Sequence, residues 1–334
     1  QTIADKLAIT KVSVSKAVNG QPGISRELRE KILLACGEMG YELKKSRARA
    51  ESYNFYILLH RRYFLEGEKF YTVILYHLNK LCSNDRHPTN FYIISDGEKL
   101  EPGFVQNMKN RSISGIFILG EIEGKFINEI KKYQIPMVSI DCDYVGQNID
   151  QVLIDSYESI QTAMRYLIGL GHKDFGFSGN IRHSDNIFDR FMGYSKMLMK
   201  HELEQRGEWV IVECNYYNNY NSDFYLPEVL PTAFVCHCDK AAAVLIERLK
   251  KMGYRIPGDI SVIGFDNTDI CMDTEPTISS MNVKKDLLAR SAYDLMLDRI
   301  ENPDAPVRRI KINCELIVRQ STGAVPARKR ASAI

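Results

Sequence analysis

The sequence lacks several features that would assign its class at once. No run of about 18 apolar residues occurs, and no positively charged segment followed by an apolar one opens the chain. We therefore expect neither a membrane-spanning helix nor a secretory leader, and a cytoplasmic protein. A glycine-rich phosphate loop, a G-x-S-x-G elbow and an H-E-x-x-H motif are also missing. We therefore expect that the protein is not an enzyme and that it needs no cofactor.

The eight cysteines are scattered along the chain. A chain of 334 residues, 45% of them hydrophobic, can bury substantial cores without disulfides, so we expect reduced thiols. A possible metal-binding cluster is formed by Cys236, His237 and Cys238, but no second Cys/His pair lies nearby at the spacing that metal ligands need. We therefore expect no metal site.

Residues 3–19 have a pattern that predicts local structure. Apolar side chains recur at helical spacing on both sides of a break too short for anything but a turn. The Thr10 hydroxyl can cap the second helix, and Ala17 and Val18 form part of its inner face. This pattern predicts a helix-turn-helix. The outer face of the second helix suits phosphates and base edges in a DNA major groove, and it carries Lys11, Val12, Ser13, Ser15 and Lys16. Thr10, at the start of this helix, is a further candidate DNA contact.

A plain helical hairpin in a core is the alternative to a DNA-reading head. Two observations favour the head. Ser25 begins a third helix pattern that runs to Met39, and the first 50 residues hold ten Lys/Arg against five Asp/Glu, whereas the whole chain has a net charge of +2. The predicted DNA-binding domain is therefore 1–46. The basic segment that follows, 47–54, is interpreted as a hinge linker that can lie against phosphates, or as a merely solvated linker.

From residue 53 onward, short apolar strands alternate with amphipathic helices, as in a parallel sheet built from βαβ units. Typical strands are 55–59, 115–119 and 233–236, and a short helix is expected at 225–230. The fold class is an all-α head followed by tandem doubly wound α/β modules. We expect a domain at 55–323, with subdomains of about 55–151 plus 284–307 and 152–283 plus 308–323, and a basic tail at 324–334.

Ligands of open α/β sheets bind at the carboxyl ends of the strands, so two facing modules predict a site in the cleft between them. Polar and aromatic residues at these ends suit the hydroxyls and ring faces of a sugar. A structural role remains the alternative for each, as for Asp155, which could simply cap the next helix. The candidate ligand-binding residues are His60, Asp96, Asp141, Tyr144, Tyr157, Arg190, Cys238 and Asp266.

Several ordered segments resemble the LacI/GalR family of bacterial transcription regulators. They include IADKLAITKVSVSKAVNG near the start, YLIGLGHKDFGFSGN in the middle, and PTAFVCHCDKAAA, GYRIPGDISVIGFDNT and ELIVRQST further on. The resemblance implies a homodimer that binds a pseudo-palindromic operator in double-stranded DNA, with an effector domain like a periplasmic sugar-binding protein. By position, Lys11, Val12 and Lys16 would contact bases, Ser13 and Asn19 would contact the backbone or cap, and Arg190 and Asp266 would hold the effector.

The chain departs from the family pattern at two positions. Cys238 stands where the family often has a ligand-contacting Asn, and Ala50 stands where a Leu usually wedges into the minor groove. Arg47 and Arg49 could instead supply minor-groove or phosphate contacts. The sequence thus predicts a repressor of carbohydrate genes. A small ligand, expected to be a sugar, modulates its affinity for the operator. The alternative is a sugar-binding protein with weakened or lost operator binding.

Overall fold

The computed structural model describes residues 3–7, 9–18, 24–39, 52–65, 69–95, 97–214, 220 and 223–325. The chain divides into two compact units, Gln1–Ser52 and Tyr53–Ile334. The division falls inside the predicted hinge linker. The predictions for Asn19, Arg47, Arg49, Ala50 and Asp96, and for residues 326–334 of the tail, lie outside the described residues.

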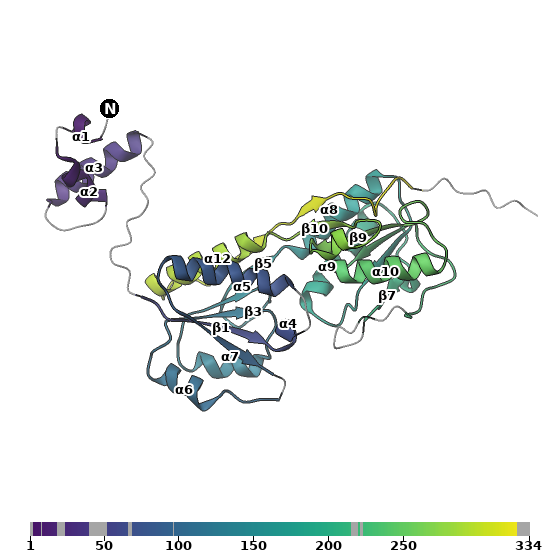
Figure 1. Cartoon of the computed structure of the whole chain (residues 1–334), viewed down its shortest axis with the longest axis horizontal. Helices are drawn as coiled ribbons and strands as arrows, with labels where there is room; N and C mark the ends of the chain where they lie inside the picture. The colour runs from purple at the N-terminus through teal and green to yellow at the C-terminus, as the bar shows by residue number, and fades with distance from the viewer. Residues whose placement is uncertain are drawn as a thin grey trace, which may run out of the picture. The chain divides into compact units, whose positions relative to one another are not determined.

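The first unit is a small helical domain with its own core (Figure 1). Its helices are α1 (Ile3–Lys6), α2 (Lys11–Val18) and α3 (Arg26–Glu38). Their inner faces meet in a cluster whose fully buried members are Ile3, Ala17, Ile32, Ala35 and Cys36. The apolar spacing in the sequence therefore predicts this packing correctly.

The side-chain hydroxyls of Thr10 and Ser25 cap the N-termini of α2 and α3, as expected. The backbone N–H of Ser13 donates to Thr10 Oγ1 at 3.1 Å, and the N–H of Leu28 donates to Ser25 Oγ at 3.2 Å. Each bond satisfies one of the free amides of a first helical turn. These caps fix where α2 starts and hence which side chains lie on its outer face.

The second unit contains two sheets. The first runs β11-β5-β4-β3-β1-β2 and is parallel throughout. Helices α5 and α12 cover one face and α6 and α7 the other (Figure 1). The bounds are β1 Phe55–His60, β2 Thr89–Ile94, β3 Gly115–Leu119, β4 Met137–Ile140, β5 Asp150–Ile154, β11 Arg309–Ile312, α4 Arg62–Leu65, α5 Lys69–Asn84, α6 Pro102–Lys109, α7 Gly124–Lys131 and α12 Lys285–Glu301.

The second sheet runs β12-β10-β9-β8-β6-β7, with β12 antiparallel to β10 and the other pairs parallel. Helices α8 and α9 pack on one face, and α10 packs on the other with the short α11. The bounds are β6 Phe175–Ser178, β7 Val210–Ile211, β8 Ala233–Cys236, β9 Ser261–Asp266, β10 Ser279–Asn282, β12 Glu315–Ile317, α8 Ser156–Gly169, α9 Asp185–Lys200, the 3-10 turn η1 Gly207–Trp209, α10 Asp239–Lys251 and α11 Ile270–Asp273.

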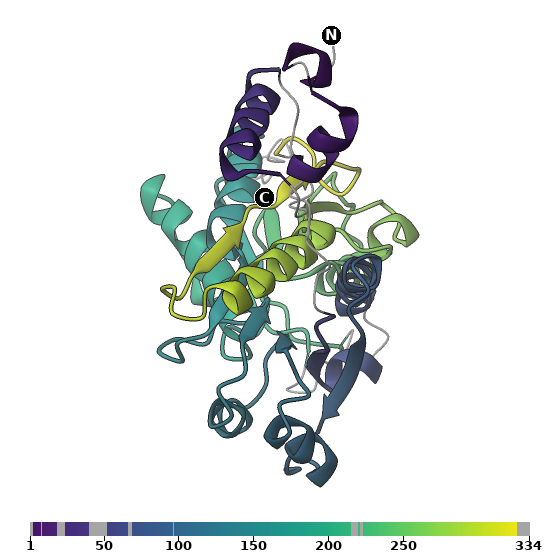
Figure 2. The same cartoon turned by 90° about the vertical axis from the view of Figure 1, so that its left-hand side faces the viewer.

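Within the described residues from 52 to 325, the chain passes between the two modules after β5, before α12 and after β11. In Figure 2 the yellow-green helix α12 and the yellow strand that follows it lie side by side. The sequence placed 152–283 and 308–323 in the second module. This is wrong for β5 and β11, which pair with one another in the first sheet. Local patterns show that a segment is a strand, but the choice of sheet depends on pairing between distant segments.

The helix expected at 225–230 is also wrong, because these residues are irregular. Pro227 and Pro231 disfavour helical geometry at the residue before each of them. Tyr225 and Val229 are 78% and 67% exposed, so they contribute no buried helical face. Among the described helices, none is long and apolar enough to cross a membrane.

Candidate functional site

The outer face of α2 carries the predicted DNA-contacting side chains. Lys11, Val12 and Ser15 are exposed, with Val12 at 63%, while Ser13 and Lys16 are half-buried. Ala17, on the opposite side of the helix, is buried in the head core. The Thr10 hydroxyl is engaged as the cap and also lies 2.9 Å from Ser13 Oγ. The arrangement presents cations, a hydroxyl and a methyl-bearing side chain on one helical surface, which can meet phosphates and base edges.

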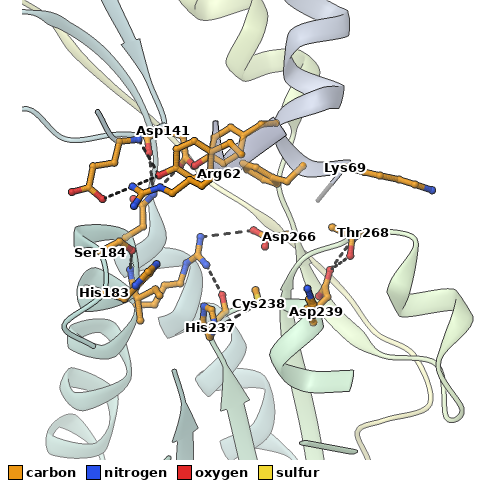
Figure 3. Close-up of a pocket in the computed structure, with 18 of the residues that line it drawn as sticks. Arg62, Lys69, Asp141, His183, Ser184, His237, Cys238, Asp239, Asp266 and Thr268 are labelled. Carbon is orange, nitrogen blue, oxygen red and sulfur yellow. Dashed lines mark hydrogen bonds and ion pairs between the residues drawn. The ribbon is translucent and has the colours of Figure 1, made fainter. Parts of the chain in front are cut away.

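A cavity of about 360 Å³ lies between the two α/β modules of the second unit. Its walls come from the carboxyl ends of strands and from the helices that follow them, as the fold predicts. The first module contributes residues around α4 and α5 and after β4. The second contributes the start of α9 and the segments after β8 and β9. Figure 3 shows these side chains converging on one space.

Arg190 is the buried cation of this cavity. It lies on α9 and is 6% exposed. Its guanidinium donates to the His237 carbonyl and, at 3.4 Å, to Ser156 Oγ, and its Cζ lies 3.9 Å from the centroid of the Phe265 ring. Arg190 Nη2 is 3.8 Å from Asp266 Oδ1. These contacts hold a planar, forked donor at the cavity wall.

Asp141 follows β4 and faces the cavity from the first module. Its backbone has φ +61°, a left-handed conformation that Asp tolerates better than most side chains. Oδ2 accepts a hydrogen bond from the Tyr71 hydroxyl at 2.9 Å, and Oδ1 accepts one from Asn186 Nδ2 at 3.0 Å. Burial raises the pKa of Asp141 to about 6, although Arg190 and the Tyr71 hydroxyl oppose the rise and Asp266 adds to it.

Asp266 and Asp239 face the cavity from the second module. Asp266, at the end of β9, has φ +100°, and its backbone carbonyl accepts from Lys285 Nζ at 2.6 Å. Asp239, the first residue of α10, accepts from Ser280 Oγ at 2.5 Å and from the backbone and hydroxyl of Thr268 at 2.6 and 3.0 Å. Burial, and next the charge of Asp266, raises the pKa of Asp239 to about 6.

A buried ion pair supports the same wall. His237 Nε2 lies 3.0 Å from Glu213 Oε1, and Ser178 donates to Glu213 Oε2 at 2.7 Å. Burial lowers the pKa of His237, but the neighbouring Cys238 and Glu213 outweigh it and raise the pKa to about 10. This pair fixes the His237 backbone, whose carbonyl accepts from Arg190.

Cys238 caps α10, because its sulfur accepts from the Ala241 N–H at 3.4 Å. Nearby, Glu213, Cys214 and His237 bring potential metal-ligand atoms within 4.8 Å of one another. Since the Glu213 carboxylate already accepts from Ser178 and faces His237, we assign this group the role of a buried ion pair.

Four of the predicted ligand-binding residues line the cavity: Asp141, Arg190, Cys238 and Asp266. His60, Tyr144 and Tyr157 do not line it. His60 Nδ1 accepts from the Arg62 N–H at 3.2 Å, and the Tyr144 hydroxyl bonds the backbone of Ile122. Tyr157 lies against α9, with Lys196 Nζ 4.8 Å from the centroid of its ring.

Sequence reasoning missed several lining residues. Phe70 and Tyr71 lie at the start of α5, whose pattern indicates core packing, and Asn186 lies one turn before Arg190 on α9. His237, which lies between two cysteines in the sequence, also lines the cavity. A signal was available for Asn186, because polar residues in the first turn of a helix that follows a strand face the ligand end of a sheet.

Comparison with known proteins finds relatives over nearly the whole chain. Residues 164–322 match a family model described as a periplasmic binding protein-like domain. The chain is 27% identical over 329 residues to the NTD biosynthesis operon regulator NtdR of Bacillus subtilis (strain 168), covering 96% of this chain and 98% of the relative.

Two solved structures share the fold over 96% of this chain and 98% of their own, each with a TM-score of 0.67. One is a complex of the transcriptional regulator CelR with cellobiose, at 19% sequence identity. The other is the lac repressor dimer bound to operator and the anti-inducer ONPF, at 17%.

Proposed function

Because the chain belongs to the LacI/GalR family of bacterial transcription regulators, we propose that it is a cytoplasmic repressor that binds operator DNA as a homodimer and whose operator affinity is set by a small ligand. One observation carries the proposal. A helix-turn-helix with a cationic outer face and a two-module cavity lined by charged and aromatic side chains occur in the same chain. The chain is a regulator and not an enzyme.

The cavity supports a sugar-like ligand. Asp141 and Asp266 offer carboxylate acceptors, Arg190 offers a donor, and the rings of Phe70 and Tyr71 line the same space. Paired hydroxyls suit carboxylates and guanidinium groups, and the apolar side of a sugar ring suits an aromatic face. The repressor would therefore serve genes of carbohydrate metabolism.

The mechanism is thermodynamic linkage between the cavity and the heads. Asp141 and Asp266 belong to different modules, so a ligand that contacts both favours one angle between the modules. At the mouth, Lys69 of the first module and Asp269 of the second already approach to 2.6 Å. A ligand changes operator affinity only by the difference in its own affinity for the two module arrangements.

An apolar surface on the first module supports the homodimer. The edge strand β2 exposes Phe91 (52%) and Ile93 (41%), while its alternate residues are buried beneath α6 and α7. On α5, Val73 and Tyr76 are 36% and 60% exposed. Exposed apolar side chains gathered in this way mark interaction surfaces.

Selection from random double-stranded DNA, followed by gel shifts with the full chain, tests the proposal. We expect an inverted-repeat site, an affinity that falls steeply with salt, and a shift that a cavity ligand changes. Arg190→Met should abolish the ligand response while operator binding persists, because the buried donor is lost but the head is untouched. Calorimetric ligand binding unchanged in Arg190→Met would contradict the cavity assignment. Absence of any salt-dependent shift would favour the alternative, a sugar-binding protein without operator binding.

A further inference from the structure

The cavity between the two modules has an excess of negative charge. Among the described lining residues, eight carry carboxylates and four are Lys or Arg. The carboxylates are Glu121, Asp141, Asp143, Asp185, Asp239, Asp266, Asp269 and Asp273, and the cations are Arg62, Lys69, Arg190 and Lys240.

Most of these cations already face a partner within the wall. Arg62 Nη2 lies 3.2 Å from Glu121 Oε2, and Lys69 Nζ lies 2.6 Å from Asp269 Oδ2. Lys240 Nζ lies 4.7 Å from the centroid of the Tyr220 ring. Arg190 is therefore the cation of this wall that serves the deep carboxylates. His237 is paired with Glu213, Arg309 pairs with Asp143, and Lys285 Nζ donates to the backbone carbonyl of Asp266. Carboxylates still outnumber cations at this wall, so a ligand with a further negative charge would be disfavoured.

Two of the deep carboxylates keep acceptor capacity for a ligand. Asp239 is committed to Ser280 and Thr268. Asp141 receives one hydrogen bond on each oxygen, which leaves a further acceptor position on each. Asp266 has Arg190 beside it at 3.8 Å, longer than a hydrogen bond.

Backbone geometry supports a ligand role for the same pair. Asp141 and Asp266 both have positive φ values, at +61° and +100°. Residues other than glycine rarely adopt such conformations, and of the eight that do so among the described residues, these two line the cavity. Figure 3 shows the two carboxylates approaching the space from different walls, and the strands they follow belong to different sheets.

We propose that the ligand carries an ammonium group, as an amino sugar does, and that this group sits between Asp141 of the first module and Asp266 of the second. The inference rests on the proposed function only in taking this cavity as the effector site. An ammonium between the two carboxylates relieves their mutual repulsion and supplies donors to both. Because the carboxylates lie on different modules, the same contact draws the modules together. A neutral sugar would leave Arg190 as the cation shared by the two carboxylates and would add no further compensation of their charge.

Matched sugar pairs test the ammonium directly. Calorimetry with the full chain at pH 7 compares glucose, galactose and mannose with glucosamine, galactosamine and mannosamine, and adds glucuronate as an anion. We expect at least one amine to bind tenfold or more tightly than its hydroxyl parent, and glucuronate to bind more weakly than glucose. If no amine shows a tenfold preference, or if glucuronate binds more tightly than glucose, the inference is wrong.

Charge-removing variants locate the effect. Asp141→Asn keeps the size of the side chain and tolerates positive φ, so we expect it to lose the amine preference. Asp304→Asn, in an exposed turn after α12, is the matched control and should keep it. A preference that survives in Asp141→Asn overturns the assignment. Gel shifts on the same preparations separate the two proposals, because an amine preference without operator binding would contradict only the repressor function.

Discussion

The buried carboxylate of Asp141 should weaken the ligand-free protein at neutral pH. Its folded-state pKa of about 6 lies above the 3.8 of a free Asp side chain, so the native state binds a proton more tightly than the unfolded state. The resulting stabilisation is fully present below about pH 4 and is lost as the pH rises through about 6. At ~1.4 kcal/mol per pKa unit, the loss is about 3 kcal/mol. The full value applies because Asp141 is only 5% exposed.

Replacing Asp141 by Asn should therefore stabilise the protein while impairing its ligand site. Asn accepts the bond from Tyr71 and tolerates φ +61°, and Asn186 Nδ2 can keep its 3.0 Å bond to the backbone carbonyl of residue 141 while it loses the bond to Oδ1. Near pH 4 the variant and the parent should unfold with similar free energies. At pH 7.5 the variant should be more stable by about 3 kcal/mol, since it has no buried charge to remove from water.

Urea unfolding without ligand, at fixed protein concentration and several pH values between 4 and 8, measures this difference. Asp304→Asn removes an exposed carboxylate and controls for the change in net charge. This prediction fails if the difference in unfolding free energy between Asp141→Asn and the parent is the same at pH 4.5 and 7.5. It also fails if the parent is the more stable protein at pH 7.5.

Two further predictions concern the head and the dimer. Lys16→Ala should weaken binding to the selected operator by about 1–3 kcal/mol and relax sequence preference at one position per half-site. Lys31→Ala, which removes an exposed lysine of α3, is the control and should do neither. A uniform loss of affinity across DNA sequences would instead make Lys16 a phosphate contact. Tyr76→Lys should shift the protein toward monomers in light scattering, because it places a charge on the exposed apolar surface of α5; an unchanged mass would remove this surface from the dimer interface.

Local patterns predicted much of the fold because local forces decide it. The strand 115–119 is apolar throughout because both faces of a parallel sheet are covered, and the structure gives it the same bounds. Thr10, Ser25 and Asp155 cap helices through their own side chains. The assignment of β11 to the second module was wrong because its partner, β5, lies far away in sequence.

The candidate site was only partly predictable, for a related reason. Position after a strand places a residue at the correct edge of a sheet, and Asp141 and Asp266 are examples. It does not give the direction of the side chain, so His60 and Tyr144 were expected in the cavity but bond the nearby backbone. Tyr71 was missed because the inner face of α5 serves both the core and the cavity wall.

The order in which the first sheet is assembled bears on how the chain is made. Strand β11, which completes that sheet, and α12, which covers one of its faces, both follow the whole second module up to β10. During synthesis, the β5 edge and the apolar surface of α5 therefore stay uncovered until the second module up to β10, and then α12 and β11, have emerged. The two modules cannot mature one after the other as independent domains do. A truncation before Arg309 should disable both modules, and the nascent chain should depend on chaperones late in synthesis.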